Sequence, residues 1–390
     1  MFNLTPEETA MLFTKTYNRF NELKTFLLSS PPQETKNSRS LQVDIVKGIA
    51  ILLVVAGHAK FSLSLWWNQY AFHMQLFFIV AGFFINFNSS LAAFIFQKIK
   101  ALLVPFYVYL LFFAGLTYML VHTGFPFYGY GKVSDIFSWK AFLIKPYLHN
   151  HHIFLFLPMW FVSTLFQVML LVAVTRPLLR FFSKNYLRIT AALLFCLLTA
   201  QVTILYAKPI TDFFDTGWLT RLIIVYGLVA GGFFLWKLKE LWNRTSVLAT
   251  AVILHLVLAW NYNPEYTMSW NNYGQGMLPR IFIPVSLCGT AAIFAIARVF
   301  EQMHMTGKFL AFCGKKSFHI MALHLMWIFL ISLTADIICK KDLTKLGFFN
   351  WSSAVAPALL FAGSLALSLL SCCLIDLLRN TFLKFSSKSR

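Results

Sequence analysis

The sequence predicts an all-α integral membrane protein, and three observations support this. The 390-residue chain is 58% hydrophobic and only 12% charged, with a mean hydropathy of +0.68, whereas soluble domains carry about 25% charged residues. Ten apolar stretches are each long enough, or nearly so, to cross a bilayer. Lys and Arg are concentrated in alternate connections between these stretches. We therefore expect a bundle of about ten transmembrane helices.

The ten apolar stretches occupy most of the chain after residue 38. With the N-terminus inside, the inner connections hold roughly twice as many Lys and Arg residues as the outer ones. This bias predicts that both termini are cytoplasmic. The predicted spans are 42–59, 70–90, 101–121, 156–175, 188–207, 219–236, 246–260, 280–298, 317–338 and 353–378.

Residues 1–38 are expected to form a separate cytoplasmic segment, followed by a transmembrane domain over 39–390. Thr5-Pro6-Glu7-Glu8 has the pattern of a capping box with proline at the first helical position. Apolar residues then recur at helical spacing, which predicts an amphipathic helix on the inner leaflet. A linker containing Pro31-Pro32 joins this helix to the first span.

The net charge of +19 does not indicate nucleic-acid binding, because no basic patch with base-stacking spacing is present. In a membrane protein, Lys and Arg collect at the cytoplasmic surface and contact anionic lipids. We expect membrane lipids, and no nucleic acid, as partners of these charges.

The first predicted span contains three ionisable residues, Asp44, Lys47 and His58. Charged groups inside a bilayer are costly and are candidates for function. At 100° per residue the three fall within an arc of about 60°, and Lys47 and His58 are separated by about 16 Å along the helix. One helix face thus connects a charged inner end with an imidazole, which suits general-base chemistry.

Each of these residues also has a purely structural interpretation. His58 could be a neutral buried histidine bonded to a backbone carbonyl. Asp44 and Lys47 are spaced i, i+3, which favours an ion pair that makes insertion tolerable. Three roles are therefore open for Lys47: it holds an anion from the cytoplasm, it orients the site, or it only neutralises Asp44.

Other polar residues lie at or inside the predicted spans. His73 opens the second span, toward the same side of the membrane as His58, where the two could share a pocket or His73 could face water. Lys98 and Lys100 precede the third span and could anchor it or contact phosphates. Arg280 opens the eighth span and His324 lies inside the ninth.

Residues 149–152, His-Asn-His-His, lack the ligand spacing of a metal site. We expect no metal.

Five segments of the chain resemble the acyltransferase 3 family of membrane O-acyltransferases, most closely its sugar O-acetylase branch. Many members have Arg in place of Lys47, Pro in place of Gln75 and Ser in place of Ala81, and two arginines in the basic stretch. The similar segments are 44–58 (Asp-x-x-Lys-Gly-Ile-Ala-Ile…Gly-His), 72–82 (Phe-His-Met, Leu-Phe-Phe and Gly82), 98–105 (Lys to Pro), 160–162 (Trp-Phe-Val) and 317–324 (Ser to His).

This resemblance implies transfer of an acyl group, usually acetyl from acetyl-CoA as co-substrate, to a hydroxyl of a cell-surface polysaccharide or a lipid-linked glycan precursor, with no bound cofactor. It implies a bacterial inner-membrane location and a ten-span fold. His58 would be the catalytic base, supported by Asp44 and Lys47. The remaining implied roles are acyl-CoA binding by Lys47, Lys98 and Lys100, and an acceptor or oxyanion pocket formed by His73, Trp160, Arg280 and His324.

Two other function classes are compatible with the polar helix face. In a transporter, the face would form a proton or substrate pathway, although the sequence lacks the corresponding broken helices in two halves that many transporters have. In a non-catalytic membrane scaffold, the charges would have only a structural role.

Overall fold

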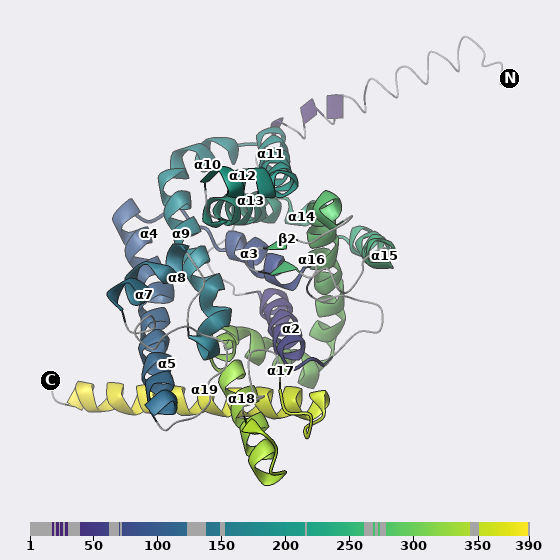
Figure 1. Cartoon of the computed structure of the whole chain (residues 1–390). Coiled ribbons are helices and arrows are strands. Elements are labelled where there is room, and N and C mark those ends of the chain that lie inside the picture. Colours follow the sequence, from purple (N-terminus) through teal and green to yellow (C-terminus); the bar gives the residue numbers. More distant parts are fainter. Residues whose placement is uncertain are drawn as a thin grey trace.

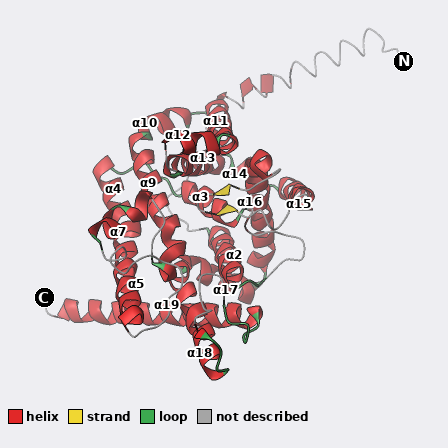
Figure 2. Ribbon diagram, viewed as in Figure 1, coloured by secondary structure: helices red, strands yellow, loops and turns green. Residues whose placement is uncertain are grey.

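The computed structural model describes most of the chain after residue 39. Within that part the protein is helical, apart from one antiparallel pair of two-residue strands, β1 (Met268–Ser269) and β2 (Asn272–Tyr273) (Figure 2). The predicted N-terminal helix and linker lie mainly outside the described residues. These are 40–61, 70, 72–122, 138–148, 153–214, 217–260, 268–269, 272–273, 278–343 and 351–388, with isolated residues between 18 and 29.

Among the described residues, eight helical segments are long and apolar enough to cross a membrane. Two shorter apolar helices, α3 (His73–Phe83) and α15 (Thr245–Trp260), lie at the positions of the second and seventh predicted spans. The fold class is confirmed, whereas ten crossings and cytoplasmic termini stay predictions. The eight segments are α2 (Leu41–His58), Leu91–His122, Leu155–Val174, α11 (Tyr186–Leu205), α13 (Trp218–Lys237), Arg280–Gln302 within α16 (Leu278–Gln302), α18 (Ser317–Ile338) and Pro357–Thr381 within α19 (Pro357–Lys388).

Two of these segments contain more than one helix type. Leu91–His122 consists of α4 (Leu91–Lys98), the π-helix η2 (Ile99–Leu103) and α5 (Val104–His122). Leu155–Val174 begins in the 3-10 helix η3 (Phe154–Met159) and continues as α9 (Trp160–Val174). Short helices complete the bundle: α7 (Trp139–Leu143), α8 (Lys145–Leu148), α10 (Arg176–Phe182), α12 (Ala207–Phe214), α14 (Lys239–Trp242) and α17 (His304–Lys315).

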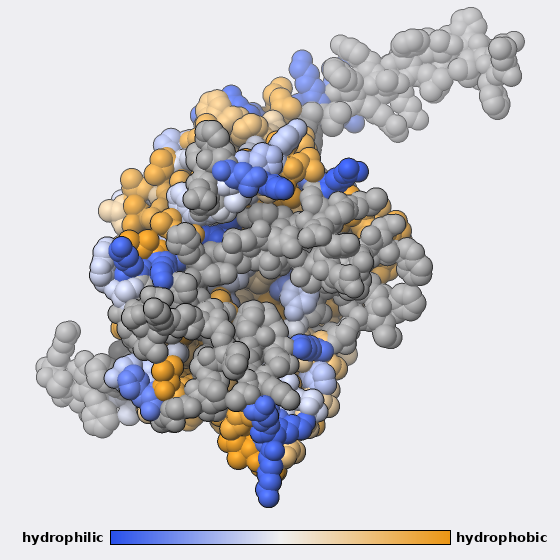
Figure 3. Space-filling view, viewed as in Figure 1, coloured by the Kyte–Doolittle hydropathy of each residue, from blue (hydrophilic) through white to orange (hydrophobic). Residues whose placement is uncertain are grey.

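Helix α2 lies near the middle of the bundle, while α19 runs across one end of the view (Figure 1). Most of α2 is buried, whereas α5, α11, α15 and α19 carry large apolar side chains at the surface. Figure 3 shows such apolar surface over several parts of the molecule. This distribution is the one a bilayer requires, because lipid solvates apolar side chains that water would not. Examples are Leu111, Phe195, Leu198, Ile253 and Leu378.

Glycines allow two helix pairs to approach closely. A Cβ on Gly48 of α2 would overlap the carbonyl oxygen of Leu310, and one on Gly314 of α17 would overlap that of Asp44. The pair α3 and α13 is similar, since a Cβ on Gly232 would overlap the carbonyl oxygen of Ile79. Small residues serve this purpose in membrane bundles, where apolar burial does not drive helices together. The first glycine contact fixes the N-terminal half of α2 against α17.

Helices α2 and α18 end in the same way. Lys60 and Lys340 have positive φ angles of 55° and 50°. In each case the amide of that lysine and the amide after it bond to carbonyls of the last helical turn, which is the Schellman arrangement. At α2 the bonds are Lys60 N to Gly57 O at 3.1 Å and Phe61 N to Ala56 O at 2.9 Å. Both ends are thus defined without glycine.

Candidate functional site

A contact between two histidines joins α2 to α18. Nε2 of His324 lies 3.2 Å from Nδ1 of His58, and the ring centroids are 4.9 Å apart. Each Nδ1 also faces the carbonyl oxygen four residues earlier, at 3.0 Å for Val54 and 2.9 Å for Ile320. The side chain of His324 is completely buried, whereas that of His58 is partly exposed. The histidine within the ninth predicted span is therefore a direct neighbour of the predicted base.

The contacts determine which nitrogens carry protons when both rings are neutral. A carbonyl oxygen only accepts, so Nδ1 of His324 donates to Ile320 and Nε2 of His324 is an acceptor. Nδ1 of His58 must then carry the proton that is shared between Val54 and His324. The remaining nitrogen, Nε2 of His58, is left with a lone pair. This is the protonation state that a general base requires.

The segment after α18 holds the end of α2 from the other side. The indole nitrogen of Trp351 donates to the carbonyl oxygen of His58 at 2.5 Å. The neighbouring Ser352 hydroxyl bonds to the buried Asp336 carboxylate, and Lys341 Nζ bonds to Ser353 at 2.6 Å. These bonds tie residues 351–353 to the end of α18. The backbone of His58 is thereby fixed relative to the helix that carries His324.

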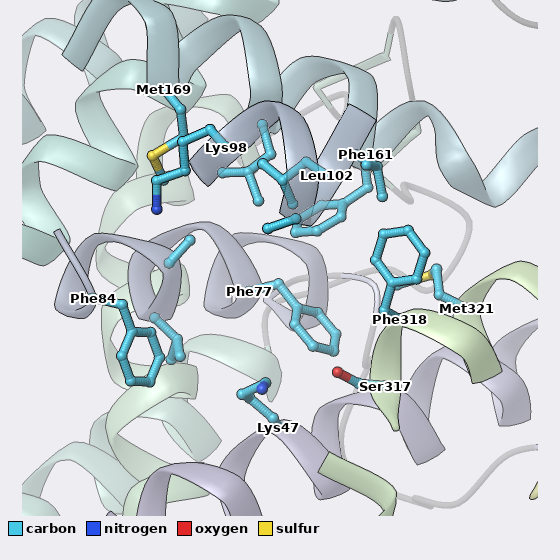
Figure 4. Close-up of a pocket in the computed structure, with 15 residues that line it drawn as sticks. Lys47, Phe77, Phe84, Lys98, Leu102, Phe161, Met169, Ser317, Phe318 and Met321 are labelled. Carbon is cyan, nitrogen blue, oxygen red and sulfur yellow. The ribbon is translucent and has the colours of Figure 1, made fainter. Parts of the chain in front are cut away.

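A cavity of about 400 Å³ lies toward the N-terminal ends of α2 and α18, away from the histidine pair. Figure 4 shows Lys47 and Ser317 on one side of it and Lys98 and Met169 on the opposite side. The walls between them are apolar. The lining residues are Lys47, Phe77, Val80, Ala81, Phe84, Lys98, Ala101, Leu102, Phe161, Val162, Leu165, Met169, Ser317, Phe318 and Met321.

Helices α2 and α18 both lead from this cavity to the histidine pair. Lys47 lines the cavity, and His58 lies about 16 Å further along α2 at 1.5 Å per residue. Ser317 lines it too, and His324 lies about 10 Å further along α18. The two helices therefore run in the same direction here, with two amino groups at the apolar cavity and two imidazoles beyond it.

The structure separates the residues that the sequence assigned to acyl-CoA binding. Lys47 and Lys98 line one cavity, whereas Lys100 is exposed and is not among its lining residues. The amino group of Lys98 lies 5.1 Å from the centroid of the Phe94 ring. The π-helix that begins at Ile99 widens the turn immediately after Lys98. Pro105 is the second residue of the helix that follows, and a proline cannot donate the backbone bond that a regular α-helix needs.

The other predicted site residues lie around this centre. Asp44 is buried at 3% exposure, one turn before Lys47. His73 is also buried and packs edge-on against Tyr70, with centroids 5.3 Å apart. Trp160 begins α9, directly before two residues that line the cavity. Arg280 is exposed at the start of α16. The acceptor and oxyanion roles of these residues stay predictions.

No group of three His, Cys, Asp or Glu residues within the described part of the chain is arranged to hold a metal ion. The His-Asn-His-His run at 149–152 lies outside the described residues.

Sequence patterns did not reveal two parts of this site. Trp351 occupies a position typical of an interfacial aromatic belt, and nothing in its spacing indicated a bond to the His58 carbonyl. Ser317 and Met321 line the cavity from α18, two turns and one turn before His324, respectively. The helical spacing 317, 321, 324 could have shown that they share a face with that histidine.

Comparison with known proteins identifies the family of the chain. No curated protein and no solved structure gave a significant match. The family model described as an acyltransferase domain, that of acyltransferase 3, matches residues 40–377, a range that includes the histidine pair and every residue lining the cavity. The chain therefore belongs to the acyltransferase 3 family of membrane acyltransferases.

Proposed function

We propose that this protein is an O-acyltransferase that moves an acetyl group from acetyl-CoA to a hydroxyl of a cell-surface polysaccharide or lipid-linked glycan precursor in the bacterial inner membrane. The single observation that supports this most strongly is the His58–His324 contact, because it puts the proton on Nδ1 of His58 and makes Nε2 the basic nitrogen. A cavity with two lysines lies further along the same helix. Family membership supplies the reaction class.

In the proposed reaction, Nε2 of His58 takes the proton of the acceptor hydroxyl as its oxygen attacks the thioester carbonyl carbon. The carbon–sulfur bond then breaks, and the coenzyme A sulfur receives the proton from His58. The products are an acetyl ester and the free thiol. His324 acts as a positioning residue, since its Nε2 accepts from Nδ1–H of His58 and stabilises the imidazolium that forms.

The cavity suits the donor in its shape and charge. Coenzyme A is an anionic cytosolic molecule whose reactive end is a flexible, largely uncharged arm. Lys47 and Lys98 supply positive charge on opposite sides of the cavity, and Phe77, Phe161 and Leu165 supply apolar walls. We propose that the arm lies here with its thioester directed along α2 toward His58.

The direct test is acetyl transfer in membranes that contain the protein at normal levels. Labelled acetyl-CoA is supplied, and the acetyl content of the surface glycan is measured. His58→Ala should lower transfer by about 10²- to 10⁴-fold. His122→Ala is the matched control, because His122 is exposed and bonds to the carbonyl of Tyr118 at 2.9 Å in the same i−4 manner. Unchanged transfer by His58→Ala would disprove the proposed role, and glycan uptake without transfer would indicate a transporter.

A further inference from the structure

Two arginines converge on one backbone segment at the far end of α9. Nη2 of Arg176 bonds to the carbonyl oxygens of Phe87 and Ser89, and Nη2 of Arg180 bonds to that of Phe87 as well. The two arginines lie on α10, and Phe87 and Ser89 lie on the connection between α3 and α4. Two like charges thus share a single carbonyl acceptor.

Aromatic rings lie beneath this cluster. The guanidinium carbons of Arg176 and Arg180 are 5.5 and 5.8 Å from the centroid of the Phe87 ring. Phe87 in turn packs against Phe233 at 5.3 Å, and the amino group of Lys237 lies 5.8 Å from the Phe233 centroid. Three cations from α10 and α13 therefore surround two packed rings.

The charge of this cluster is poorly compensated. Arg176 is only 8% exposed, and its Nε has no hydrogen-bond partner within the described structure. Burial lowers the pKa of Arg176, and the charge of Arg180 lowers it further. By contrast, the positive charge of Lys316 is neutralised, because its amino group pairs with the carboxylate of Asp376. A buried cation that is bonded only to carbonyl oxygens would be stabilised by an anion.

The cluster is connected to the cavity through two helices. Arg176 lies seven residues after Met169, about 10 Å along a helical path, and Met169 lines the cavity beside Lys98. The bonded carbonyl of Ser89 immediately precedes Ser90, whose hydroxyl caps α4, and α4 ends at Lys98. The predicted orientation places this end of the molecule at the cytoplasmic surface. Arg180 is exposed there, so a soluble or lipid anion can reach it.

We propose that Arg176 and Arg180 form a phosphate-binding site at the cytoplasmic end of the bundle. Guanidinium groups suit phosphate because their planar donors bond to two oxygens at once. The phosphate belongs either to the nucleotide part of the acyl donor or to an anionic phospholipid headgroup. The site itself stands without the acyl-transfer proposal, and only the first of these two sources rests on it.

The test measures binding by the whole purified protein in phosphatidylcholine nanodiscs, titrated with adenosine 3′,5′-bisphosphate. Arg180→Gln should weaken binding at least tenfold, because it removes an exposed donor without emptying a buried site. Arg188→Gln is the matched control: it removes the same charge from a guanidinium that lies 4.4 Å from the centroid of the Phe181 ring instead. Thermal unfolding of each variant verifies that it is folded.

A second arm identifies the source of the phosphate. Nanodiscs that contain phosphatidylglycerol are analysed by native mass spectrometry for lipid that stays bound to the released protein. Nucleotide binding that Arg180→Gln weakens assigns the site to the donor, and lipid retention that the same variant abolishes assigns it to a headgroup. If Arg180→Gln changes neither binding, or if neither probe binds the unsubstituted protein, the proposal is overturned.

His58→Ala separates this proposal from the acyl-transfer proposal. The variant should still bind the bisphosphate, because binding needs no chemistry at the histidine pair. If instead the unsubstituted protein binds the bisphosphate but transfers no acetyl group, the phosphate site is upheld while the proposed function fails.

Discussion

Helices α2 and α18 are alike in local structure and differ in their surroundings. Each carries a histidine whose Nδ1 faces the carbonyl four residues earlier, and each ends in a Schellman arrangement with a lysine at positive φ. Yet His58 is partly exposed and is the last residue of α2, whereas His324 is fully buried in the first half of α18. The comparison shows that exposure of the side chain, and not local backbone geometry, distinguishes His58, the proposed base, from His324, which positions it.

The largest expected effect comes from replacing the two histidines. His58→Ala should lower kcat by about 10²- to 10⁴-fold, the contribution of a general base. His324→Leu should have a smaller effect, about tenfold or more, because it removes the acceptor for Nδ1–H of His58 and leaves the base in place. Steady-state acetyl transfer by purified protein measures both values.

His324→Gln tests whether His324 positions the base or only fills space. A glutamine retains an oxygen that can accept from His58, so part of the activity lost in His324→Leu should return. The pH dependence of kcat should also differ between the two variants. Equal activity and identical pH profiles for both would show that the contact has no role in proton transfer.

The next effect concerns the glycine contact that holds α2 against α17, the helix leading into α18. Gly48→Ala should destabilise the protein by about 1–3 kcal/mol, because the new methyl group overlaps the backbone of Leu310. Gly115→Ala is the matched control. A Cβ there meets nothing within 4 Å, so the better helix propensity of alanine should stabilise by up to about 1 kcal/mol. Opposite shifts in thermal unfolding are expected, and shifts of the same sign would contradict the close approach.

The lysines of the cavity extend the comparison to the end of α2 that lies away from His58. Lys47→Ala and Lys98→Ala should raise KM for acetyl-CoA about tenfold while kcat changes little, as expected when binding is lost equally from substrate and transition state. Lys100→Ala should change KM little, because Lys100 is exposed outside the cavity. A fall in kcat for Lys47→Ala at unchanged KM would instead assign Lys47 to orienting the site.

The smallest effect is expected at the C-terminal ends of α2 and α18, which have the same Schellman arrangement. Lys60→Gly and Lys340→Gly should each stabilise the protein by about 1 kcal/mol, since a residue with a Cβ pays roughly this amount at positive φ. Thermal unfolding in detergent is the measurement. A loss of stability in either variant would show that the lysine side chain contributes more than its backbone strain costs.

The membrane class and the positions of the helices followed from the sequence, because long apolar stretches and Lys/Arg asymmetry are local properties. The charged face of the first span predicted a catalytic role for His58, and that role stays a prediction. The partner of His58 did not, since His324 lies 266 residues away and no spacing rule connects two helices. Lys98 and Lys100 looked equivalent in sequence, and the π-helix after Lys98 coincides with their different environments. In the sequence, Arg176 and Arg180 look like ordinary interfacial charges. Only the structure shows that both bond to the carbonyl oxygen of Phe87.

The end of α2 at His58 has one further consequence for the proposed chemistry. Peptide dipoles add along a helix and place about half a negative charge at its C-terminus. A ring that becomes positive in the last turn of α2 gains about 0.3–1 kcal/mol from this field, and up to about 2 kcal/mol where it is partly buried. His324, deep within α18, lies away from such a terminus. The dipole of α2 therefore favours positive charge on His58, the histidine that is proposed to take the proton.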